Sequence, residues 1–436
     1  MESNERIKVI DSPCGFGKTE WAIQYINKLP EYTRIVYITP FLKECERIKS
    51  SCSKKFFATP DAKRGRGSKM IDMIALINKG VNVVSTHALF QNIDDRLITA
   101  IRNNNYILIL DEVMDVIEKL DLYRDCINKT EEQREMLTVE DLNTLLGRGI
   151  IEVDPNTYMV KWNNTDESLN KYMQIKNLAE REMLYLVGKD LLIWSFPIEV
   201  FKEGCFEEIY ILTYQFDYQI QSYYYNFFGL EYKKYFVKET AKRKYEIFPQ
   251  EDGIIIDKQW KDGLKNLVEV CDNPKLNKIG AYYHDPSSRY ITTNLSKNWF
   301  EEATRENISV MTSNIINFFQ NVTKSKAVDR MWTCFKDDKK QFKNSYFSAK
   351  GWVELNSRAT NDYADKTALV YPINRYLNPF FLKFFSKKDI QLNQDMFALS
   401  ELIQWIFRSA IRNGKKISIY IPSQRMRELF LNWLNS

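Results

Sequence analysis

The stretch from Ile7 to Thr19 constrains the fold of this chain more than any other. An apolar run is followed by Ser-Pro-Cys-Gly-Phe-Gly-Lys-Thr and then by the helical pattern of residues 20–26. Two glycines let backbone N–H groups curl around an anion, the helix N-terminus adds partial positive charge, and a lysine reaches the outer phosphates. The pattern predicts a strand, a loop and a helix that hold a nucleotide through Ser12, Pro13, Cys14, Gly15, Phe16, Gly17, Lys18, Thr19 and Glu20.

The strict phosphate-loop pattern G-x-x-x-x-G-K-[ST] fails at one position, because Ser12 stands where the first glycine is usual. The required context of strand, loop and helix is present. The alternative is a glycine-rich turn with an incidental lysine. On the nucleotide interpretation, the Thr19 hydroxyl is a ligand for Mg²⁺.

A second strand pattern ends in two adjacent carboxylates. Residues 106–110 form a continuous apolar run, typical of a strand buried on both faces, and Asp111 and Glu112 follow directly. Downstream of a phosphate loop, such a pair divides its work: Asp111 binds Mg²⁺, and Glu112 orients or deprotonates the attacking water. The order of Lys18 and this pair predicts a site that hydrolyses ATP.

Polar residues also lie at the ends of two other predicted strands: Thr39-Pro40 ends the strand at 34–38, and the strand within 81–90 exits into Ser85-Thr86-His87. Open α/β sheets bind ligands at the carboxyl ends of their parallel strands. The segment 53–69 is basic and contains glycine. It is either a nucleic-acid contact through Lys63, Arg64 and Arg66 or a solvated loop.

Composition limits the remaining possibilities. The chain has 436 residues, 44% hydrophobic and 27% charged, which is a globular composition long enough for two domains. Its net charge of +5 is compatible with a polyanionic partner but does not require one. Seven dispersed cysteines and two histidines predict a reducing cytoplasm and no disulfide framework or zinc site. With no apolar run of about 18 residues, we expect no membrane partner.

The order of patterns predicts an α/β fold with an N-terminal domain of residues 1–232, a linker of residues 233–246 and a C-terminal domain of residues 247–436. Residues 119–190 interrupt the first domain and predict an inserted element with a helix at 138–147, a hairpin at 150–162 and a long helix at 165–187. The parallel strands resume at 191–197 and 208–214. In the second domain we expect strands at 253–256, 278–283, 352–356, 367–371 and 416–421, with helices at 313–322 and 398–412.

Taken together, these residues resemble the superfamily 2 (DEAD/DEAH-type) helicases, and within them the compact helicase-like proteins of phages and prophages of Gram-positive bacteria. Ser12 to Thr19 resembles motif I, whose usual form A-x-x-G-x-G-K-T also lacks the first glycine. Thr39-Pro40 resembles motif Ia, Ser85-Thr86-His87 the following nucleic-acid motif, and Asp111 to Met114 the D-E-x-x box. Leu212-Thr213-Tyr214 stands at motif III, from which Tyr214 departs.

The resemblance continues in the second half. Arg358 to Tyr363 stands where motif V is expected, and Gln404 to Arg412 resembles motif VI, usually Q-x-x-G-R-x-x-R. Phe407 replaces the glycine and the second arginine falls one residue late. Gln404, Arg408 and Arg412 have the spacing i, i+4 and i+8, which would place them on one face of a helix.

The resemblance implies two RecA-like (P-loop NTPase) domains with parallel sheets and with ATP and Mg²⁺ in the cleft between them. The implied catalytic residues are Glu112, Lys18, Arg408, Arg412 and Gln404, and the implied metal ligands are Thr19 and Asp111. A single-stranded or forked nucleic acid, with DNA favoured over RNA, would contact Thr39, Pro40, Ser85, Thr86, His87, Arg358 and Thr360.

The sequence therefore predicts an ATP-dependent helicase or translocase that serves phage replication or recombination. The alternative is a P-loop ATPase switch that clamps nucleic acid, or remodels a replication or recombination protein, without unwinding. A kinase is disfavoured because it would not need the helix at 398–412 in a second domain.

Overall fold

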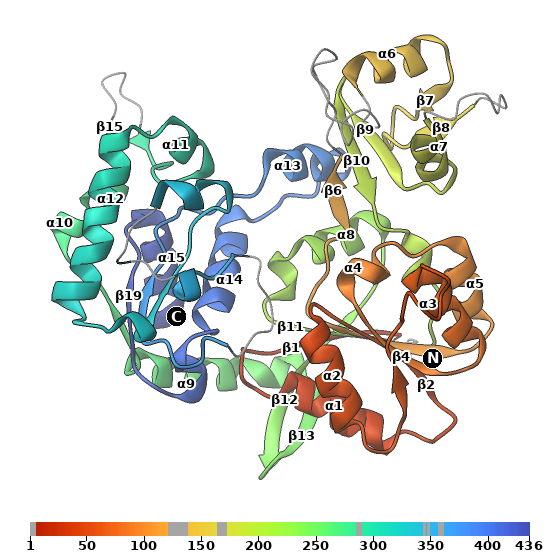
Figure 1. Cartoon of the computed structure of the whole chain (residues 1–436), viewed down its shortest axis with the longest axis horizontal. Coiled ribbons are helices and arrows are strands. Elements are labelled where there is room, and N and C mark those ends of the chain that lie inside the picture. The colour runs from red at the N-terminus through yellow and green to blue at the C-terminus, as the bar shows by residue number, and fades with distance from the viewer. Residues whose placement is uncertain are drawn as a thin grey trace.

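The computed structural model describes residues 6–120, 138–163, 172–284, 290–342, 346, 349–355 and 362–436. Two α/β units lie side by side, with a smaller inserted element above the first (Figure 1). Each unit is built around a parallel sheet, so the predicted fold class is confirmed. None of the described helices is long and apolar enough to cross a membrane.

The first unit contains an eight-stranded sheet with the order β13-β12-β1-β11-β5-β2-β4-β3. Neighbouring strands are parallel except for β13, which runs antiparallel to β12. The central strands are apolar and buried on both faces, as expected for a parallel sheet covered by helices. The strands are β1 (Ile7–Asp11), β2 (Arg34–Thr39), β3 (Phe57–Ala58), β4 (Asn82–Thr86), β5 (Tyr106–Asp111), β11 (Ile209–Thr213), β12 (Lys233–Ala241) and β13 (Lys244–Pro249).

Helices cover both faces of this sheet. Alternate residues of each strand point to opposite faces, so Ile10 packs with α1 and α2 while Val9 belongs to the core on the other face. The first face carries α1 (Lys18–Lys28) and α2 (Leu42–Ser51), and the second α3 (Lys69–Asn78), α4 (His87–Phe90), α5 (Asp95–Arg102) and α8 (Ile220–Phe228). The carboxyl ends of the parallel strands meet at one edge.

The predicted linker at 233–246 is wrong. These residues form β12 and the start of β13, and β12 pairs with β1 in the first sheet. Phe236 and Val237 are buried, while the lysines and glutamates around them lie at the edge of the sheet. The charged composition that suggests a linker is that of an edge hairpin, where charge prevents pairing with other chains.

The inserted element has its own small core and an antiparallel sheet of β6 (Ile117–Lys119), β10 (Leu191–Ser195) and β9 (Leu184–Val187). It also contains α6 (Val139–Gly147), the hairpin β7 (Ile151–Val153) and β8 (Val160–Trp162), and α7 (Met173–Glu180). The predicted helix at 138–147 is confirmed, with a capping box at Thr138, and so is the hairpin.

Two predictions in this region are wrong. The long helix at 165–187 is only α7 within the described residues, because Glu182 has a positive φ of 57° and the next residues enter β9. The strand at 191–197 is β10, which belongs to the antiparallel sheet and not to the parallel one. Sequence pattern does not distinguish these cases, because four consecutive apolar residues fit a buried strand as well as a helix face.

The second unit has a four-stranded parallel sheet with the order β14-β19-β18-β17. Its strands are β14 (Val268–Val270), β17 (Arg330–Trp332), β18 (Ala368–Val370) and β19 (Ile417–Tyr420), and β15 (Tyr283–His284) pairs with β16 (Tyr290–Ile291) outside it. Its helices include α9 (Gly253–Lys265), α10 (Pro274–Asn277), α11 (Lys297–Glu302), α12 (Arg305–Asn317), α14 (Gln394–Ile406) and α15 (Gln424–Asn435).

The strands predicted at 367–371 and 416–421 are confirmed as β18 and β19. The helix predicted at 313–322 is the end of α12 and a π-helical turn at Phe318–Val322. Three predicted strands are wrong. Residues 253–256 begin α9, and residues 278–283 form a 3-10 turn at Lys278–Gly280 before β15 begins at Tyr283. Of 352–356, the described residues contribute only a bridge from Trp352 to Trp332. The β-branched run at 254–256 favours a strand locally, but the spacing of Trp260 and Leu264 places α9 against the core.

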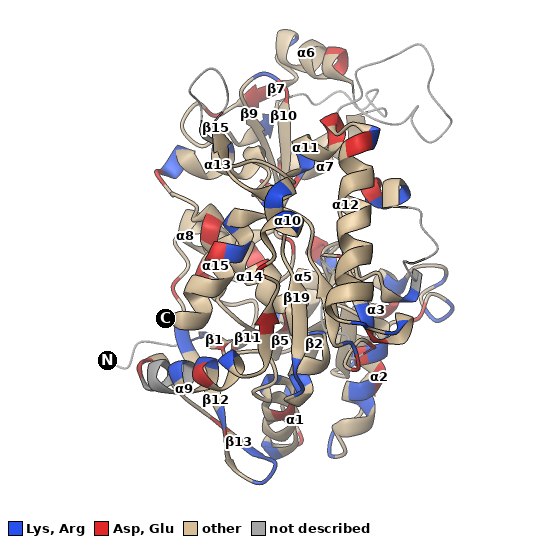
Figure 2. Ribbon diagram, turned by 90° about the vertical axis from the view of Figure 1, so that its left-hand side faces the viewer, with Lys and Arg blue, Asp and Glu red and all other residues tan. Residues whose placement is uncertain are grey.

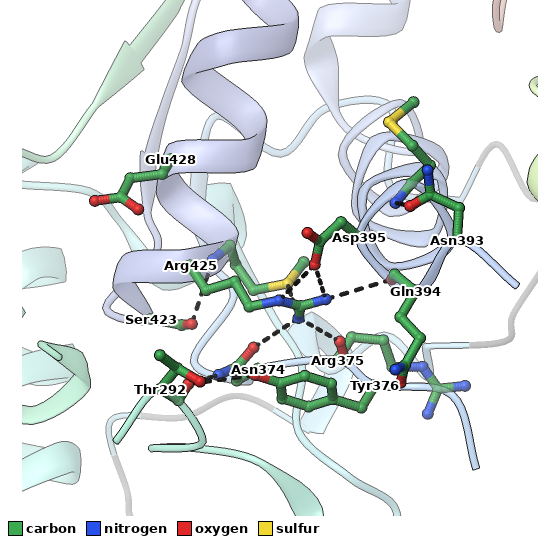
Figure 3. Close-up of polar contacts among 12 residues, drawn as sticks. Thr292, Asn374, Arg375, Tyr376, Asn393, Gln394, Asp395, Ser423, Arg425 and Glu428 are labelled. Atoms are coloured by element: carbon green, nitrogen blue, oxygen red, sulfur yellow. Dashed lines mark hydrogen bonds and ion pairs between the residues drawn. The ribbon is translucent and has the colours of Figure 1, made fainter. Parts of the chain in front are cut away.

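A segment of the second unit reaches back to the first. It leaves after β18, forms α13 (Pro379–Phe385) and returns at α14 (Figure 1). On α13, Phe384 is buried and packs against Tyr185 and Phe227, with ring centroids 5.3 and 4.7 Å away. Arg425 of α15 holds both ends of the segment: it donates to the Asp395 carboxylate at 2.6 and 2.8 Å and to the carbonyl oxygen of Arg375 at 2.7 Å (Figure 3).

Candidate nucleotide-binding site

The loop between β1 and α1 has the geometry of an anion cradle. Gly15 and Gly17 both have a φ of 88°, in the left-handed region that favours glycine. At Gly17 a Cβ would also overlap the ring of Tyr245, so no other residue fits without displacing that ring. The Lys18 Nζ donates to the carbonyl oxygens of Ser12 and Pro13, at 2.7 and 3.2 Å, and therefore lies folded over the loop.

The structure explains why a serine occupies the first position of the loop. The Ser12 hydroxyl oxygen accepts a hydrogen bond of 2.7 Å from the backbone N–H of Val237 on β12, and both residues are fully buried. A glycine or alanine would leave this N–H without a partner away from water. Serine at this position of the phosphate loop therefore joins the loop to the edge hairpin through a hydrogen bond.

Thr19 and Asp111 lie together at the ends of α1 and β5. The Thr19 hydroxyl is 3.4 and 3.5 Å from the two carboxylate oxygens of Asp111, and the Tyr37 hydroxyl donates to that carboxylate at 3.0 Å. Burial, together with the neighbouring Glu112, raises the pKa of Asp111 to about 7, against the lowering effect of the Tyr37 hydrogen bond. A hydroxyl and a buried carboxylate are a suitable pair of oxygen ligands for Mg²⁺.

Two polar atoms in the same place have no partner. Among the described residues, Glu112 Oε2 and Gln404 Nε2 are buried and make no hydrogen bond. Glu112 also has a positive φ of 70°, which is strained for a residue with a side chain. Such strain and such unpaired groups persist chiefly where a ligand or a reaction uses them.

These groups line one cavity of about 270 Å³ between the two units. The first unit contributes the phosphate loop, the start of α1 and the carboxylates that follow β5, and the second contributes the end of α14 and the turn after it. The lining residues are Cys14, Gly15, Gly17, Lys18, Thr19, Glu20, Glu44, Arg47, Asp111, Glu112, Tyr245, Gln404, Phe407, Arg408, Arg412 and Asn413. Eleven of the predicted site residues are therefore brought together: Cys14, Gly15, Gly17, Lys18, Thr19, Glu20, Asp111, Glu112, Gln404, Arg408 and Arg412.

The predicted single helix face of Gln404, Arg408 and Arg412 is wrong. Helix α14 ends at Ile406, and a separate 3-10 turn spans Ala410–Asn413. The two arginines differ in environment. Arg408 is buried, and its guanidinium donates to the carbonyl oxygens of Glu354 and Leu355 at 3.0 and 3.2 Å, whereas Arg412 is exposed beside the cavity. They reach the cavity because the chain turns after the helix, and not because they share a face of it.

The residues predicted to contact nucleic acid divide into three groups. Thr39 and Ser85 are buried at the ends of neighbouring strands, so their side chains are not presented to a strand in this arrangement. Pro40, Thr86 and His87 are half-buried, and His87 Nε2 lies 3.1 Å from the carbonyl oxygen of Asp111. Arg358 and Thr360 lie outside the described residues.

In the basic loop at 53–69, Arg64 makes contacts within the protein itself. Arg64 forms an ion pair of 2.8 Å with Asp72 of α3 and donates to the carbonyl oxygen of Thr59 at 2.7 Å. Elsewhere, Lys and Arg lie among Glu along α2 (Figure 2).

Sequence reasoning missed several residues of the cavity. Tyr37 does not itself line the cavity, but it lies on β2, the neighbour of β5, and its hydroxyl donates to the carboxylate of the lining residue Asp111. Arg47 of α2 forms ion pairs of 2.6 and 3.1 Å with Glu20 and Glu44. Tyr245 comes from the hairpin that was predicted as a linker. The spacing of Glu44 and Arg47 (i, i+3) was a visible signal for the pair, but nothing local indicates that it faces the phosphate loop.

Comparison with known proteins places this architecture. Residues 132–194 match the YonV middle domain, which covers most of the inserted element, and residues 262–434 match the YonV C-terminal Rossmann-like domain. A solved structure described as XPD in its apo form resembles the chain with a TM-score of 0.51 and 10% identity, over 99% of this chain and 96% of that one. Xpd4 of S. tokodaii resembles it with a TM-score of 0.46 and 10% identity, over 98% and 94% of the two chains.

The fold is thus a helicase-like arrangement of two parallel-sheet domains. A sequence relative extends over the whole length. The SPbeta prophage-derived protein YonV of Bacillus subtilis (strain 168) is 38% identical over 442 residues, covering 99% of each chain. The chain therefore belongs to the YonV family.

Proposed function

We propose that this chain is an ATP-dependent helicase or translocase that acts on single-stranded or forked nucleic acid, DNA in preference to RNA, in the replication or recombination of a prophage. One observation carries the proposal: the cavity between the units is lined by a phosphate loop and two carboxylates on one side and by Gln404, Arg408 and Arg412 on the other. The helicase-like fold and the prophage relative support it.

In this proposal the first unit binds the nucleotide. The loop amides between Gly15 and Lys18 surround the β-phosphate, and Lys18 exchanges its two carbonyl partners for the outer phosphate oxygens. Thr19 and Asp111 hold Mg²⁺, which supplies positive charge at the phosphates. The unpaired carboxylate oxygen of Glu112 accepts a hydrogen bond from the attacking water and orients it.

The second unit completes the site. Arg412, exposed beside the cavity, contacts the γ-phosphate, and Arg408 fixes the turn that carries it. Gln404, whose side-chain nitrogen is buried without a partner, hydrogen-bonds to the water or to the phosphate. Approach of the two units would assemble these groups around ATP, and hydrolysis would release them.

Nucleic acid would lie across the edge where β2 and β4 end, close to Pro40, Thr86 and His87. Binding there would be independent of sequence and sensitive to salt, because phosphate contacts dominate such interfaces. The His87 contact with the backbone of Asp111 offers a short route between this edge and the nucleotide.

A second candidate function is an ATPase switch that clamps nucleic acid or remodels a protein partner without unwinding. The position of α13 favours it, because Phe384 of the second unit is buried in the core of the first and limits how far the units can separate. Strand separation distinguishes the two functions.

The test is steady-state ATP hydrolysis with and without single-stranded DNA, single-stranded RNA and duplex DNA, followed by strand displacement on a forked duplex. Lys18→Ala should abolish hydrolysis, while Lys28→Ala, an exposed lysine in the last turn of the same helix, should not. Stimulation by nucleic acid with strand displacement supports the helicase. Stimulation without displacement supports the switch, and hydrolysis that no nucleic acid changes refutes the nucleic-acid motor.

A further inference from the structure

The two aromatic residues that depart from the helicase pattern lie against the same tryptophan. Tyr214 stands at motif III and Phe407 replaces the motif VI glycine. The ring of Trp260 on α9 is 6.1 Å from Tyr214, with an angle of 87° between the planes, and 5.1 Å from Phe407, with an angle of 34°. A third ring, Phe16 of the phosphate loop, is 5.6 Å from Trp260 at 88°. These distances and angles are those of favourable aromatic pairs.

Trp260 belongs to the second unit but contacts two strand ends of the first. Trp433 of α15, in the same unit, also packs against Trp260, with ring centroids 5.9 Å apart. Tyr214, which directly follows β11 of the first sheet, is buried in the core of the second unit. The cluster of Phe16, Tyr214, Trp260 and Phe407 is therefore a direct contact between the units.

Two rings of this cluster, Phe16 and Phe407, are adjacent in sequence to groups of the nucleotide site. Phe16 lies between the two glycines whose amides form the cradle, so the loop cannot move without moving this ring. Phe407 directly precedes Arg408 and begins the turn that carries Arg412. Packing is close in such contacts, so a displacement of one ring is transmitted to the next.

We propose that Trp260 is a positioning residue that couples occupation of the phosphate loop to the placement of the turn with Arg408 and Arg412. This inference rests on the proposed function, because it assigns to the cluster the role of bringing that turn to the nucleotide. It also explains why aromatic residues occupy positions 214 and 407, because a small residue at either position would remove one of the ring contacts with Trp260.

The test compares Trp260→Leu and Trp260→Phe with Trp299→Leu, which removes another half-buried tryptophan of the second unit that does not line the cavity. We expect Trp260→Leu to lower kcat for ATP at least tenfold with KM changed less than twofold, Trp260→Phe to restore most of kcat, and Trp299→Leu to leave both unchanged. Loss of folded protein would also lower the apparent kcat at an unchanged KM, so kcat is expressed per nucleotide-binding site, titrated with a fluorescent ATP analogue.

A second readout does not depend on turnover. Nucleotide binding should change the tryptophan fluorescence of the natural chain, and Trp260→Phe should remove that change while a fluorescent ATP analogue still binds. The inference is overturned if Trp260→Leu behaves like Trp299→Leu, if KM rises as kcat falls, or if the fluorescence change survives in Trp260→Phe. A natural chain that binds nucleotide but hydrolyses none refutes the proposed function, and the fluorescence comparison then decides the role of Trp260. A chain that binds no nucleotide refutes both.

Discussion

Replacing the two arginines beside the cavity should have different effects: loss of Arg412 should lower kcat, and loss of Arg408 should lower stability. Arg412→Ala removes an exposed side chain at the cavity, so the free energy of unfolding should stay within about 0.5 kcal/mol of the natural chain. If Arg412 contacts the γ-phosphate, kcat should fall by about 10³-fold or more, equivalent to about 4 kcal/mol in the barrier.

Arg408→Ala should instead destabilise the second unit. It removes two hydrogen bonds of 3.0 and 3.2 Å from a buried guanidinium to the carbonyl oxygens of Glu354 and Leu355. Hydrogen bonds from a charged donor contribute about 1.5–3 kcal/mol each. Because both acceptor residues are half-buried and water can replace part of the loss, we expect about 3 kcal/mol in total.

The assays are single-turnover ATP hydrolysis at saturating nucleotide and nucleic acid, and thermal unfolding of the same preparations. Arg412→Lys is the matched control, since it keeps the charge but loses the planar fork and should recover only part of kcat. The reasoning is refuted if Arg412→Ala has the kcat of the natural chain while Arg408→Ala has the melting temperature of the natural chain but a greatly lowered kcat. The two roles would then be exchanged.

Three further predictions follow from single contacts. Ser12→Ala should lower the free energy of unfolding by about 1–3 kcal/mol, because the Val237 N–H loses its acceptor, and hydrogen exchange at the Val237 amide should accelerate; an unchanged exchange rate would contradict this. Gly17→Ala should weaken binding of a fluorescent ATP analogue at least tenfold, because the added Cβ overlaps the Tyr245 ring. The double variant Gly17→Ala, Tyr245→Ala should recover part of the affinity. No recovery would show that the positive φ at position 17 alone is responsible. Phe384→Ala should destabilise the chain by about 3–5 kcal/mol and make the junction at α13 sensitive to protease, whereas cleavage as slow as in the natural chain would show that the contact is dispensable.

The first half of the fold could be predicted from local patterns, since its strands are short apolar runs that end in polar or small residues. The strand, loop and helix at 7–28 and the strand that ends in Asp111 are confirmed by the structure. The second half was harder, because residues 253–356 contain short strands between aromatic helices, and a β-branched run such as 254–256 is ambiguous without its packing partners.

By itself, the sequence determined which residues can cradle phosphate and which carboxylates stand at a strand end, because these depend on neighbours within a few positions. The tertiary structure alone decided that the charged segment at 233–246 is an edge hairpin, that Arg408 and Arg412 lie on a turn after α14, and that Trp260 contacts Phe16, Tyr214 and Phe407. The physical reason is distance along the chain, because each of these features depends on packing between residues far apart in sequence. A local sequence pattern does not identify these distant packing partners.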